Sequence, residues 1–333
     1  MSFSPTVEPA PEVSVLMPAY NVTQYIGGAL DSVFSQTFEH FEVIVVNDGC
    51  PDTAALERVL RPYQSRIRYI AQSNRGVSGA RNTAARAAHA PLILHLDPDD
   101  LLEPFCLEQQ VQTMREHAEY DAVYCNSSMF GEGPLAGRCW MDVYPSAGPV
   151  SFASVLRSRT CPANPGSIIR RAALERIGFY DETLRSWEDY DVWLRILKSS
   201  PPGRIAFQTR PLARYRVRGD SLTYQSRYME YALAVLEKAA RDFELSSEEA
   251  DALRDRTELV RHEVENSRGK RALRERRWKD AIRSFEYCHR YQPSRKTEAA
   301  LLLLRTAPWA LSPLIRMWDS YLEKRADSRT PGK

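Results

Sequence analysis

The chain lacks several features that would assign it to a familiar class of protein. It contains no run of 18 uncharged apolar residues, so no membrane-spanning helix is predicted. The N-terminal segment, MSFSPTVEPAPEV, is rich in proline and has no basic stretch before an apolar core, so we expect no signal peptide. The six cysteines form no CxxC pair and no Cys/His spacing of a zinc site, which indicates reduced thiols in a cytosolic protein.

Two signatures of nucleotide binding are missing as well. The sequence has no Walker motif, and no GxGxxG follows the first expected strand, which argues against a dehydrogenase. The segment VLMPAYNVTQY, residues 15–25, contains neither lysine nor arginine. A nucleotidyltransferase would need a basic group near this strand to hold a triphosphate, so this class is disfavoured too.

What is present is the composition of a soluble globular protein, with 43% hydrophobic and 26% charged residues. The length of 333 residues suits one large α/β domain and a smaller appendage. The charge is uneven, because residues 254–333 carry 20 Lys/Arg against 11 Asp/Glu and the remainder carries 25 against 32. A basic C-terminal region could contact phosphate-bearing lipid, a membrane surface or nucleic acid, and it could equally be a solvated helical face.

Strand and helix patterns alternate over the first part of the chain. Such alternation predicts a mainly parallel, doubly wound sheet, in which ligands bind at the carboxyl ends of the strands. Three polar segments, 18–21, 47–52 and 97–100, follow expected strands, so the sequence predicts a site at this edge. The expected strands are 13–20, 41–50, 66–72, 92–96 and 122–130. Between them we expect helices at 24–36 and 54–63, and over 73–90 a Gly-containing loop that opens an Ala-rich helix.

An unusual acidic cluster closes the fourth strand, in LILHLDPDDLLEP, residues 92–104. Asp97, Asp99 and Asp100 follow an apolar run, and unpaired carboxylates in such a place are costly. A capping turn explains one aspartate readily but explains three poorly. Mg²⁺ and Mn²⁺ are commonly held by one or two carboxylates together with substrate phosphates, so the pattern favours a metal-bound diphosphate.

A second acidic cluster opens the predicted helix WEDYDVWLRIL, residues 187–197. Glu188, Asp189 and Asp191 occupy its first turn, where the helix dipole stabilises negative charge. A partly dry carboxylate held there could also remove a proton from a substrate hydroxyl. We expect Arg195 to be a salt-bridge partner.

Two arginine-bearing segments could bind an anion. In NRGVSGARN, residues 74–82, Gly76 and Gly79 permit close backbone approach, and Arg81 follows at the opening of a helix, a combination that suits pyrophosphate. In RYRVRGDSLT, residues 214–223, alternate arginines share one face of a strand and could meet a diphosphate together. The alternative for this segment is an exposed edge strand.

Taken in order, VSVLMPAYN, EVIVVNDGCPD, NRGVSGARN, LHLDPDD and IRRAALERIGFYDETLRSWEDYDVWLR resemble the family 2 glycosyltransferases over residues 13–223. The resemblance implies an α/β protein with the GT-A fold, a Rossmann-like, mostly parallel sheet flanked by helices, followed here by a C-terminal all-helical extension. It also implies inverting transfer of a sugar from a nucleoside diphosphate sugar, most commonly UDP-linked, to an acceptor hydroxyl.

The resemblance assigns chemical roles to single residues. Asp189 is expected to be the general base, with Glu188 beside it as a second catalytic acid. Asp99 is expected to ligate a divalent cation, Mn²⁺ or Mg²⁺, with Asp97 as the other acid of the metal motif. Attack on the anomeric carbon needs a base on one face and neutralisation of the departing diphosphate on the other, which the metal and Arg81 would supply.

Nucleotide-sugar contacts are expected from the loops that follow the strands. Residues 18–20 match the loop that wraps the base, and Asp48 matches the acid that contacts it. Asn47 stands where many relatives carry Asp, and Cys50 and Pro51 replace a common Ser-Thr pair. The complete expected set is Pro18, Ala19, Tyr20, Asn21, Asp48, Asn74, Gly76, Arg81, Asp97, Arg216 and Arg218.

Acceptor binding is expected from the 131–165 segment and from the start of the second acidic cluster. Trp140, with Tyr144, and Trp187 could stack on sugar faces, although packing in the interior is the alternative for each. The expected acceptor is a glycan or glycolipid in the assembly of a bacterial surface polysaccharide. The alternative function is a non-catalytic or nucleotidyltransferase-like nucleotide-binding protein with a helical interaction module.

The expected organisation is a disordered tail over residues 1–12, a catalytic domain over 13–224 and a basic helical domain over 225–333. Within the last, SSEE at residues 246–249 predicts a helix N-cap. We expect a cytoplasmic protein that can contact the inner face of the cell membrane through its basic helices. Nucleic acid is not an expected partner, and a homo-oligomer is left open.

Overall fold

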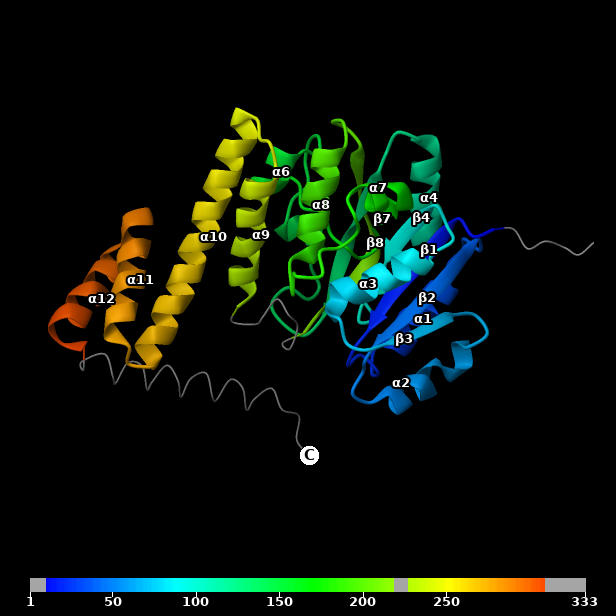
Figure 1. Cartoon of the computed structure of the whole chain (residues 1–333), viewed down its shortest axis with the longest axis horizontal. Coiled ribbons are helices and arrows are strands. Elements are labelled where there is room, and N and C mark those ends of the chain that lie inside the picture. Colours follow the sequence, from blue (N-terminus) through cyan, green and yellow to red (C-terminus); the bar gives the residue numbers. More distant parts are fainter. Residues whose placement is uncertain (1–9, 219–226, 309–333) are drawn as a thin grey trace, which may run out of the picture. The chain divides into compact units, whose positions relative to one another are not determined.

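The computed structural model describes residues 10–218 and 227–308 (Figure 1). Most of the expected N-terminal tail, the end of the 214–223 segment and the sequence from residue 309 onward lie outside the described residues. The chain divides into two compact units, residues 1–254 and 255–333, and each is described by itself.

An eight-stranded mixed sheet forms the centre of the first unit, in the order β3-β2-β1-β4-β7-β6-β8-β5. The strands β3, β2, β1 and β4 are mutually parallel, β6 and β8 are also parallel, and β7 and β5 run antiparallel to their neighbours. The expected α/β class is therefore confirmed. The bounds are β1 Val13–Ala19, β2 Phe41–Asp48, β3 Arg68–Gln72, β4 Leu92–His95, β5 Leu101–Leu102, β6 Ala122–Gly131, β7 Ile168–Arg170 and β8 Ile205–Val217.

Helices cover the sheet and bury its apolar faces (Figure 1). All seven residues of β1 are buried, as expected of a central parallel strand that is covered on both faces. The helix α1 buries four apolar residues at helical spacing, from Ile26 to Val33, in the same core. The helices of this unit up to residue 200 are α1 Ile26–Phe34, α2 Thr53–Leu60, the 3-10 helix Arg61–Tyr63, α3 Gly76–Ala87, α4 Cys106–Glu116, α5 Trp140–Val143, α6 Phe152–Leu156, α7 Arg171–Arg176 and α8 Glu188–Ser199.

The first unit extends further along the chain than the sequence analysis expected. The helix α9, Tyr228–Asp242, packs against α8, so it lies with the first unit although the expected boundary came after residue 224. The next helix, α10, Ser247–Arg274, begins in this unit and continues into the second. Its start has the expected cap, because Ser246 Oγ accepts the Glu249 N–H at 3.3 Å and the Ser246 N–H donates to Glu249 Oε2 at 2.9 Å.

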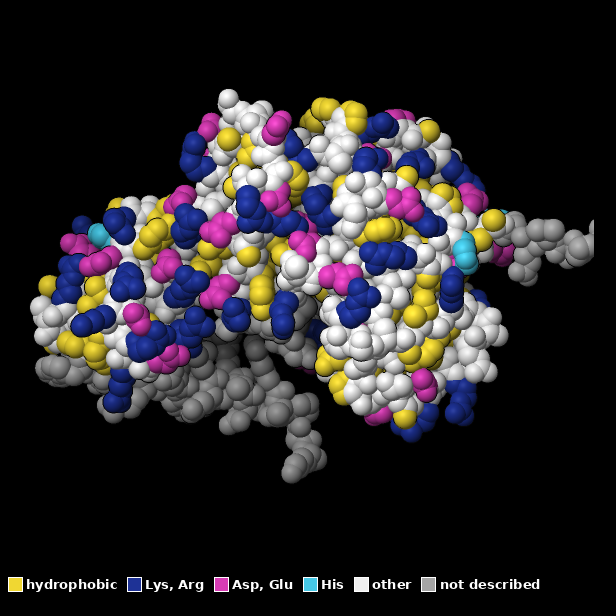
Figure 2. Space-filling view, viewed as in Figure 1, with side chains coloured by type: hydrophobic (Ala, Val, Ile, Leu, Met, Phe, Trp, Pro, Cys, Tyr) yellow, Lys and Arg dark blue, Asp and Glu magenta, His cyan; other side chains and the backbone are white. Residues whose placement is uncertain are grey.

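The second unit consists of the rest of α10 with α11, Trp278–Tyr291, and α12, Arg295–Thr306. A small core forms around Ala272, Ala281 and Leu304. Several of its arginines pair with acids of the same unit, and on the face shown in Figure 2 its basic and acidic side chains are interspersed. Within residues 10–218 and 227–308, no helix has both the length and the apolar character that crossing a membrane requires.

Candidate active site

The predicted edge of the sheet carries the expected polar residues side by side. The strands β2, β1 and β4 are adjacent and parallel, so their carboxyl ends lie next to one another. Pro18 and Ala19 are the last residues of β1, and Tyr20 follows with 48% of its surface exposed. Asn21 then adopts a left-handed backbone with φ of 54°, which turns the chain away from the sheet.

The loop after β2 is tied to the loop that opens α3. Asp48 is buried, and its carboxylate accepts hydrogen bonds from Gln72 Nε2 at 2.7 Å and from the Arg75 N–H at 2.9 Å. Gly49 has φ of +67°, and a Cβ there would lie 2.7 Å from the Asn74 nitrogen, so only glycine fits this crossing. Asp48 and Asn74, predicted separately, are thus brought together.

The contacts of Asn47 explain why an amide stands where many relatives carry Asp. Its side-chain amide donates to Thr53 Oγ1 at 3.1 Å and to the Tyr69 hydroxyl at 2.8 Å, while its oxygen accepts the Cys50 N–H at 2.8 Å. The Thr53 and Tyr69 hydroxyls donate to the Cys50 carbonyl oxygen and to Glu57, so both accept from Asn47, and a carboxylate would have no donor for them. Asn47 therefore holds the turn after β2 in place.

The acidic turn after β4 is balanced by arginines of the chain itself. Asp97 pairs with Arg81 at 2.7 Å, and Asp99 pairs with Arg218 at 2.8 Å. Asp100 is buried and accepts the Arg216 N–H at 2.7 Å, so it fixes the turn against β8. Burial, followed by the negative charge of Asp97, raises the pKa of Asp99, and Arg218 opposes that rise.

Arg216 braces the same turn from the other side. Its Nε donates to the Asp99 carbonyl oxygen at 2.7 Å. Its guanidinium carbon lies 4.3 Å from the centre of the Phe130 ring and 4.9 Å from the centre of the Tyr25 ring. Arg218 also lies over Tyr25, at 5.0 Å, so both expected diphosphate-binding arginines already have partners in the protein.

Arg81 joins the two acidic clusters. It lies on α3 with 2% of its side chain exposed, and its two terminal nitrogens pair with Asp97 at 2.7 Å and with Glu188 at 2.5 Å. Burial lowers the pKa of Arg81, but Asp97 and Glu188 outweigh burial and raise it well above its usual value. A permanent positive charge thus connects the end of β4 to the start of α8.

The start of α8 is held in an unusual conformation. Trp187, its N-cap, has φ of 63° and ψ of 16°, a left-handed backbone that is rare for a bulky residue. The turn places Glu188 against Arg81 and leaves Asp189 partly exposed. Asp189 accepts the Tyr190 N–H at 2.7 Å. Burial, followed by the negative charge of Glu188, raises the pKa of Asp189 to about 7, while Arg81 opposes the rise.

Aromatic side chains gather beside Asp189. The Trp187 ring lies 5.2 Å from that of Tyr228 and 5.1 Å from that of Tyr190. Trp140 lies 4.4 Å from Tyr144 and 5.6 Å from Tyr215. Burial raises the pKa of Tyr228, and Asp189, Tyr215 and Tyr144 raise it further, so Tyr228 is close to both groups. Sequence reasoning missed Tyr228, because no motif marks it.

Comparison with known proteins decides the family. Residues 14–178 match the model of the glycosyl transferase family 2. Chondroitin synthase from Escherichia coli is 31% identical over 204 residues, which are 60% of this chain and 28% of that enzyme. The chain belongs to glycosyltransferase family 2. The matched part covers 28–32% of the length of four of the curated relatives.

Solved structures confirm the GT-A fold of this family 2 glycosyltransferase. Residues 1–349 of S. aureus TarS, in complex with UDP-GlcNAc, superpose with a TM-score of 0.58 at 18% identity, covering 94% of this chain and 92% of that one. The mannosyltransferase PcManGT from Pyrobaculum calidifontis, in complex with GDP-Man and Mn²⁺, superposes with a TM-score of 0.55 at 18% identity, covering 94% and 84%. The expected fold is thus confirmed, and the match over residues 14–178 confirms the expected family.

The acids of the glycosyltransferase suit a divalent cation that shares its ligands with a substrate. Among the described residues, no cluster of three or more His, Cys, Asp or Glu side chains could hold a metal by itself. Asp99 and Asp97 offer the one or two carboxylates that Mg²⁺ or Mn²⁺ needs when diphosphate oxygens and water complete its shell. The Arg218 guanidinium on Asp99 marks the place where a positive charge is stabilised.

Proposed function

We propose that this enzyme transfers a sugar, with inversion, from a UDP-linked donor to a hydroxyl of a glycan or glycolipid acceptor. The observation that carries the proposal is Asp189, a partly exposed carboxyl group with its pKa raised to about 7. A carboxylate of this basicity can accept a proton at neutral pH more readily than an ordinary aspartate. It stands beside aromatic rings, and its neighbour Glu188 is connected through Arg81 to Asp97 of the predicted donor site.

The proposed binding site for the donor lies in the loops after β1, β2 and β4. Tyr20 and Asp48 are proposed to contact the base, with Pro18, Ala19, Asn21, Asn74 and Gly76 shaping the same surface. TarS, a structural neighbour of this chain, has been solved with UDP and with UDP-GlcNAc, which supports a UDP-linked donor. Arg81 is held by two acids, so direct contact with a diphosphate would require one of them to release it.

A divalent cation is proposed to be held by Asp99, with Asp97 beside it. When bound, it would neutralise negative charge on the departing diphosphate. Arg216 and Arg218 are proposed to act on the same side, because they already lie against the Asp99 turn. The Mn²⁺ in the PcManGT complex supports this assignment.

The acceptor is proposed to bind against the aromatic side chains, with Trp187 and Trp140 as its stacking surfaces. Trp187 Nε1 is buried and has no hydrogen-bond partner within the described residues, so it is available to donate to an acceptor oxygen. Tyr228 and Tyr215 extend the same surface. The chemistry fits a sugar, which offers apolar C–H faces and hydroxyls together.

Assembly of a surface polysaccharide or glycolipid in the cytoplasm is the proposed setting. The basic helices of the second unit are proposed to contact an anionic membrane surface. Sedimentation of the full chain with anionic liposomes at low and high salt tests this proposal, because electrostatic binding weakens with salt. Light scattering of the same samples tests for a homo-oligomer.

A thermal-shift panel tests the proposed donor and metal. UDP, GDP, dTDP and CMP are each added with and without Mn²⁺, to wild type and to Asp99→Ala. We expect stabilisation by UDP that depends on Mn²⁺ and is lost in Asp99→Ala. Stabilisation by another nucleotide would correct the donor class, and no shift with any nucleotide would favour the non-catalytic alternative.

A further inference from the structure

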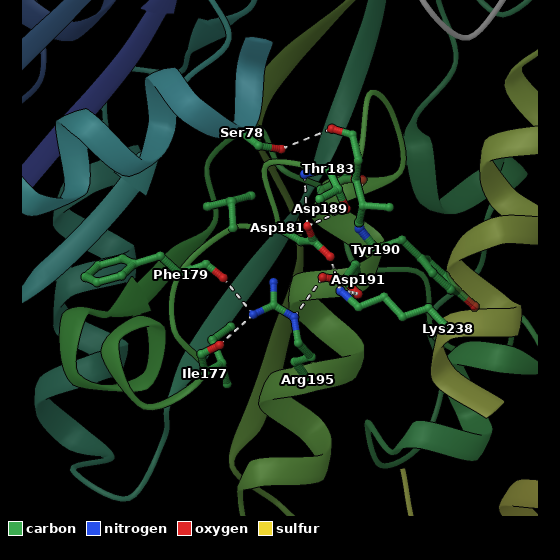
Figure 3. A network of polar contacts seen from close by, with 12 residues as sticks. Ser78, Ile177, Phe179, Asp181, Thr183, Asp189, Tyr190, Asp191, Arg195 and Lys238 are labelled. Carbon is green, nitrogen blue, oxygen red and sulfur yellow. Dashed lines mark hydrogen bonds and ion pairs between the residues drawn. The ribbon is translucent and has the colours of Figure 1, made fainter. Parts of the chain in front are cut away.

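Helix α9 reaches the start of α8 through one lysine. Lys238 Nζ lies 2.6 Å from Asp181 Oδ2 and 2.9 Å from Asp191 Oδ1, and its side chain is 18% exposed. Figure 3 shows Lys238 extending from α9 toward these two acids. One ammonium group therefore joins the loop before α8 to the first turn of α8.

Asp191 connects this lysine to the body of the catalytic helix. Its side chain is 5% exposed, and its second oxygen pairs with Arg195 Nε at 2.7 Å. Arg195 in turn donates to the carbonyl oxygens of Ile177 and Phe179 (Figure 3). Asp191 lies two residues after Asp189, so any displacement of Asp191 moves the proposed base with it.

Asp181 fixes the other end of the same loop. Its second oxygen accepts the N–H and the hydroxyl of Thr183, at 2.9 and 2.6 Å. Burial raises the pKa of Asp181, but the hydrogen bonds from Lys238 and Thr183 outweigh burial and lower it to about 2. Two ionised acids so close to one another need the shared cation.

Between these two acids lies the left-handed Trp187. A strained backbone persists only where its surroundings hold it on both sides, and Lys238 holds Asp181 before Trp187 and Asp191 after it. Tyr228, on the first turn of α9, packs on the Trp187 ring itself. The helix α9 thus holds the turn at Trp187 from which α8 and Asp189 follow, here called the corner. This helix lies beyond the residues that match the family model.

We propose that Lys238 is a positioning residue for Asp189. It binds the chain on both sides of Trp187 and thereby fixes the orientation of Asp189. This role rests on the proposed function, in which Asp189 is the base. The lysine touches neither substrate nor base, and its effect is confined to the orientation of the first turn of α8.

The chain offers a matched control at the opposite end of α8. Lys198 pairs with Glu249 of α10 at 3.0 Å, and the two side chains are 21% and 20% exposed. Both lysines therefore join α8 to a later helix through an ion pair of similar burial. Lys198 lies at the far end of α8 from Asp189, so its loss removes a comparable contact without touching the corner.

Four proteins are compared: wild type, Lys238→Met, Lys238→Arg and Lys198→Met. The rate of UDP release from UDP-GlcNAc and from UDP-glucose is measured with water as acceptor, together with the Kd for UDP in Mn²⁺ and amide hydrogen exchange over residues 186–192.

We expect Lys238→Met to lower kcat about 100-fold, because a displacement near 1 Å can cost that much. KM and the Kd for UDP should stay within twofold, and exchange over 186–192 should rise. Lys238→Arg should recover most of the rate, and Lys198→Met should leave both the rate and this exchange unchanged.

Equal losses of kcat in Lys238→Met and Lys198→Met would overturn the proposal, since α9 would then act only through general stability. Unchanged exchange over 186–192 in Lys238→Met would overturn it as well. A wild type that binds UDP but releases none from either donor would count against the proposed function instead. The exchange comparison would still decide in that case whether Lys238 fixes the corner.

Discussion

The two acidic clusters of this glycosyltransferase differ in how their charge is balanced. In the turn after β4, Asp97 and Asp99 each contact an arginine, and Asp100 accepts a backbone N–H. At the start of α8, Glu188 contacts Arg81, whereas Asp189 forms no ion pair within the described residues and its pKa rises to about 7. In the first cluster the arginines oppose the rise that burial causes in the pKa of Asp99, whereas in the second Asp189 has no ion-pair partner among the residues described and its carboxyl group can exchange a proton near neutral pH.

The difference follows from placement rather than from residue type. Both clusters have acids at adjacent or alternate positions, and both lie at the beginning of a turn or helix. Asp189 is distinguished because Arg81 pairs with Glu188 and Asp97 and makes no ion pair with it. Burial beside the negative charge of Glu188, with the nearby cation paired to other acids, raises the pKa of Asp189. Replacing either Asp189 or Arg81 should therefore remove the difference between the two clusters.

Replacing the base should have the largest effect. Asp189→Asn removes the proton acceptor but keeps the size of the side chain, so we expect transfer to fall about 10³-fold, within the range that general base catalysis contributes. Binding of UDP with Mn²⁺ should be unchanged, since the predicted donor contacts lie elsewhere. Steady-state kinetics and isothermal titration of the same preparation measure the two quantities. Normal turnover by Asp189→Asn would show that another group is the base.

Removing the shared arginine should be the next largest change. Arg81→Met leaves Glu188 and Asp97 without their cation, and breaking a buried pair typically costs about 3–5 kcal/mol of unfolding free energy. Arg75→Met is the control, because Arg75 pairs with Glu182 at a surface where both side chains are substantially exposed, and such pairs contribute about 0–1 kcal/mol. Urea unfolding compares the variants. Similar losses in both would show that Arg81 is not the buried junction described above.

The sequence predicted the positions of both clusters but not their difference. Strand and helix periodicity, the acids after LILHL and the capping sequence SSEE are local patterns, and the structure contains the corresponding strand ends and helix cap. The pairing of Arg81 with Glu188 joins residues 107 apart in the sequence, and Lys238 reaches Asp181 over 57. Such contacts depend on how α3, α8 and α9 pack, and no local pattern encodes that packing.

No sequence pattern predicted the left-handed backbone of Trp187 either. A bulky aromatic residue gives no signal for a positive φ, which sequence reasoning assigns to Gly or Asn. The conformation arises because residues on both sides of it are held by long-range contacts. The assignment of α9 to a separate domain failed to match the observed units for the same reason, since its packing on α8 is tertiary.

The pH dependence of turnover should show whether Asp189 ionises near neutral pH. The general base must be ionised, so kcat should rise about tenfold per pH unit below about 7 and level off above it. Because the pKa of Asp189 is higher in the folded state, its contribution to stability is present at low pH and is lost as the pH rises through about 7. Arg81 lowers the pKa of Asp189, so Arg81→Gln should move the midpoint of the rate profile upward. A profile without a transition between pH 5 and 8 would contradict the role of this carboxyl group.

The smallest predicted effect concerns the strain at the corner of α8. Trp187→Ala and Trp187→Gly both remove the ring contacts with Tyr228 and Tyr190, but only glycine adopts φ of 63° without cost. We therefore expect Trp187→Gly to be about 1 kcal/mol more stable than Trp187→Ala, the reverse of their order inside a helix, with the N-cap position adding to the preference. Thermal and urea unfolding of the two variants measure the difference. Equal stability would mean that the left-handed turn at Trp187 stores no strain.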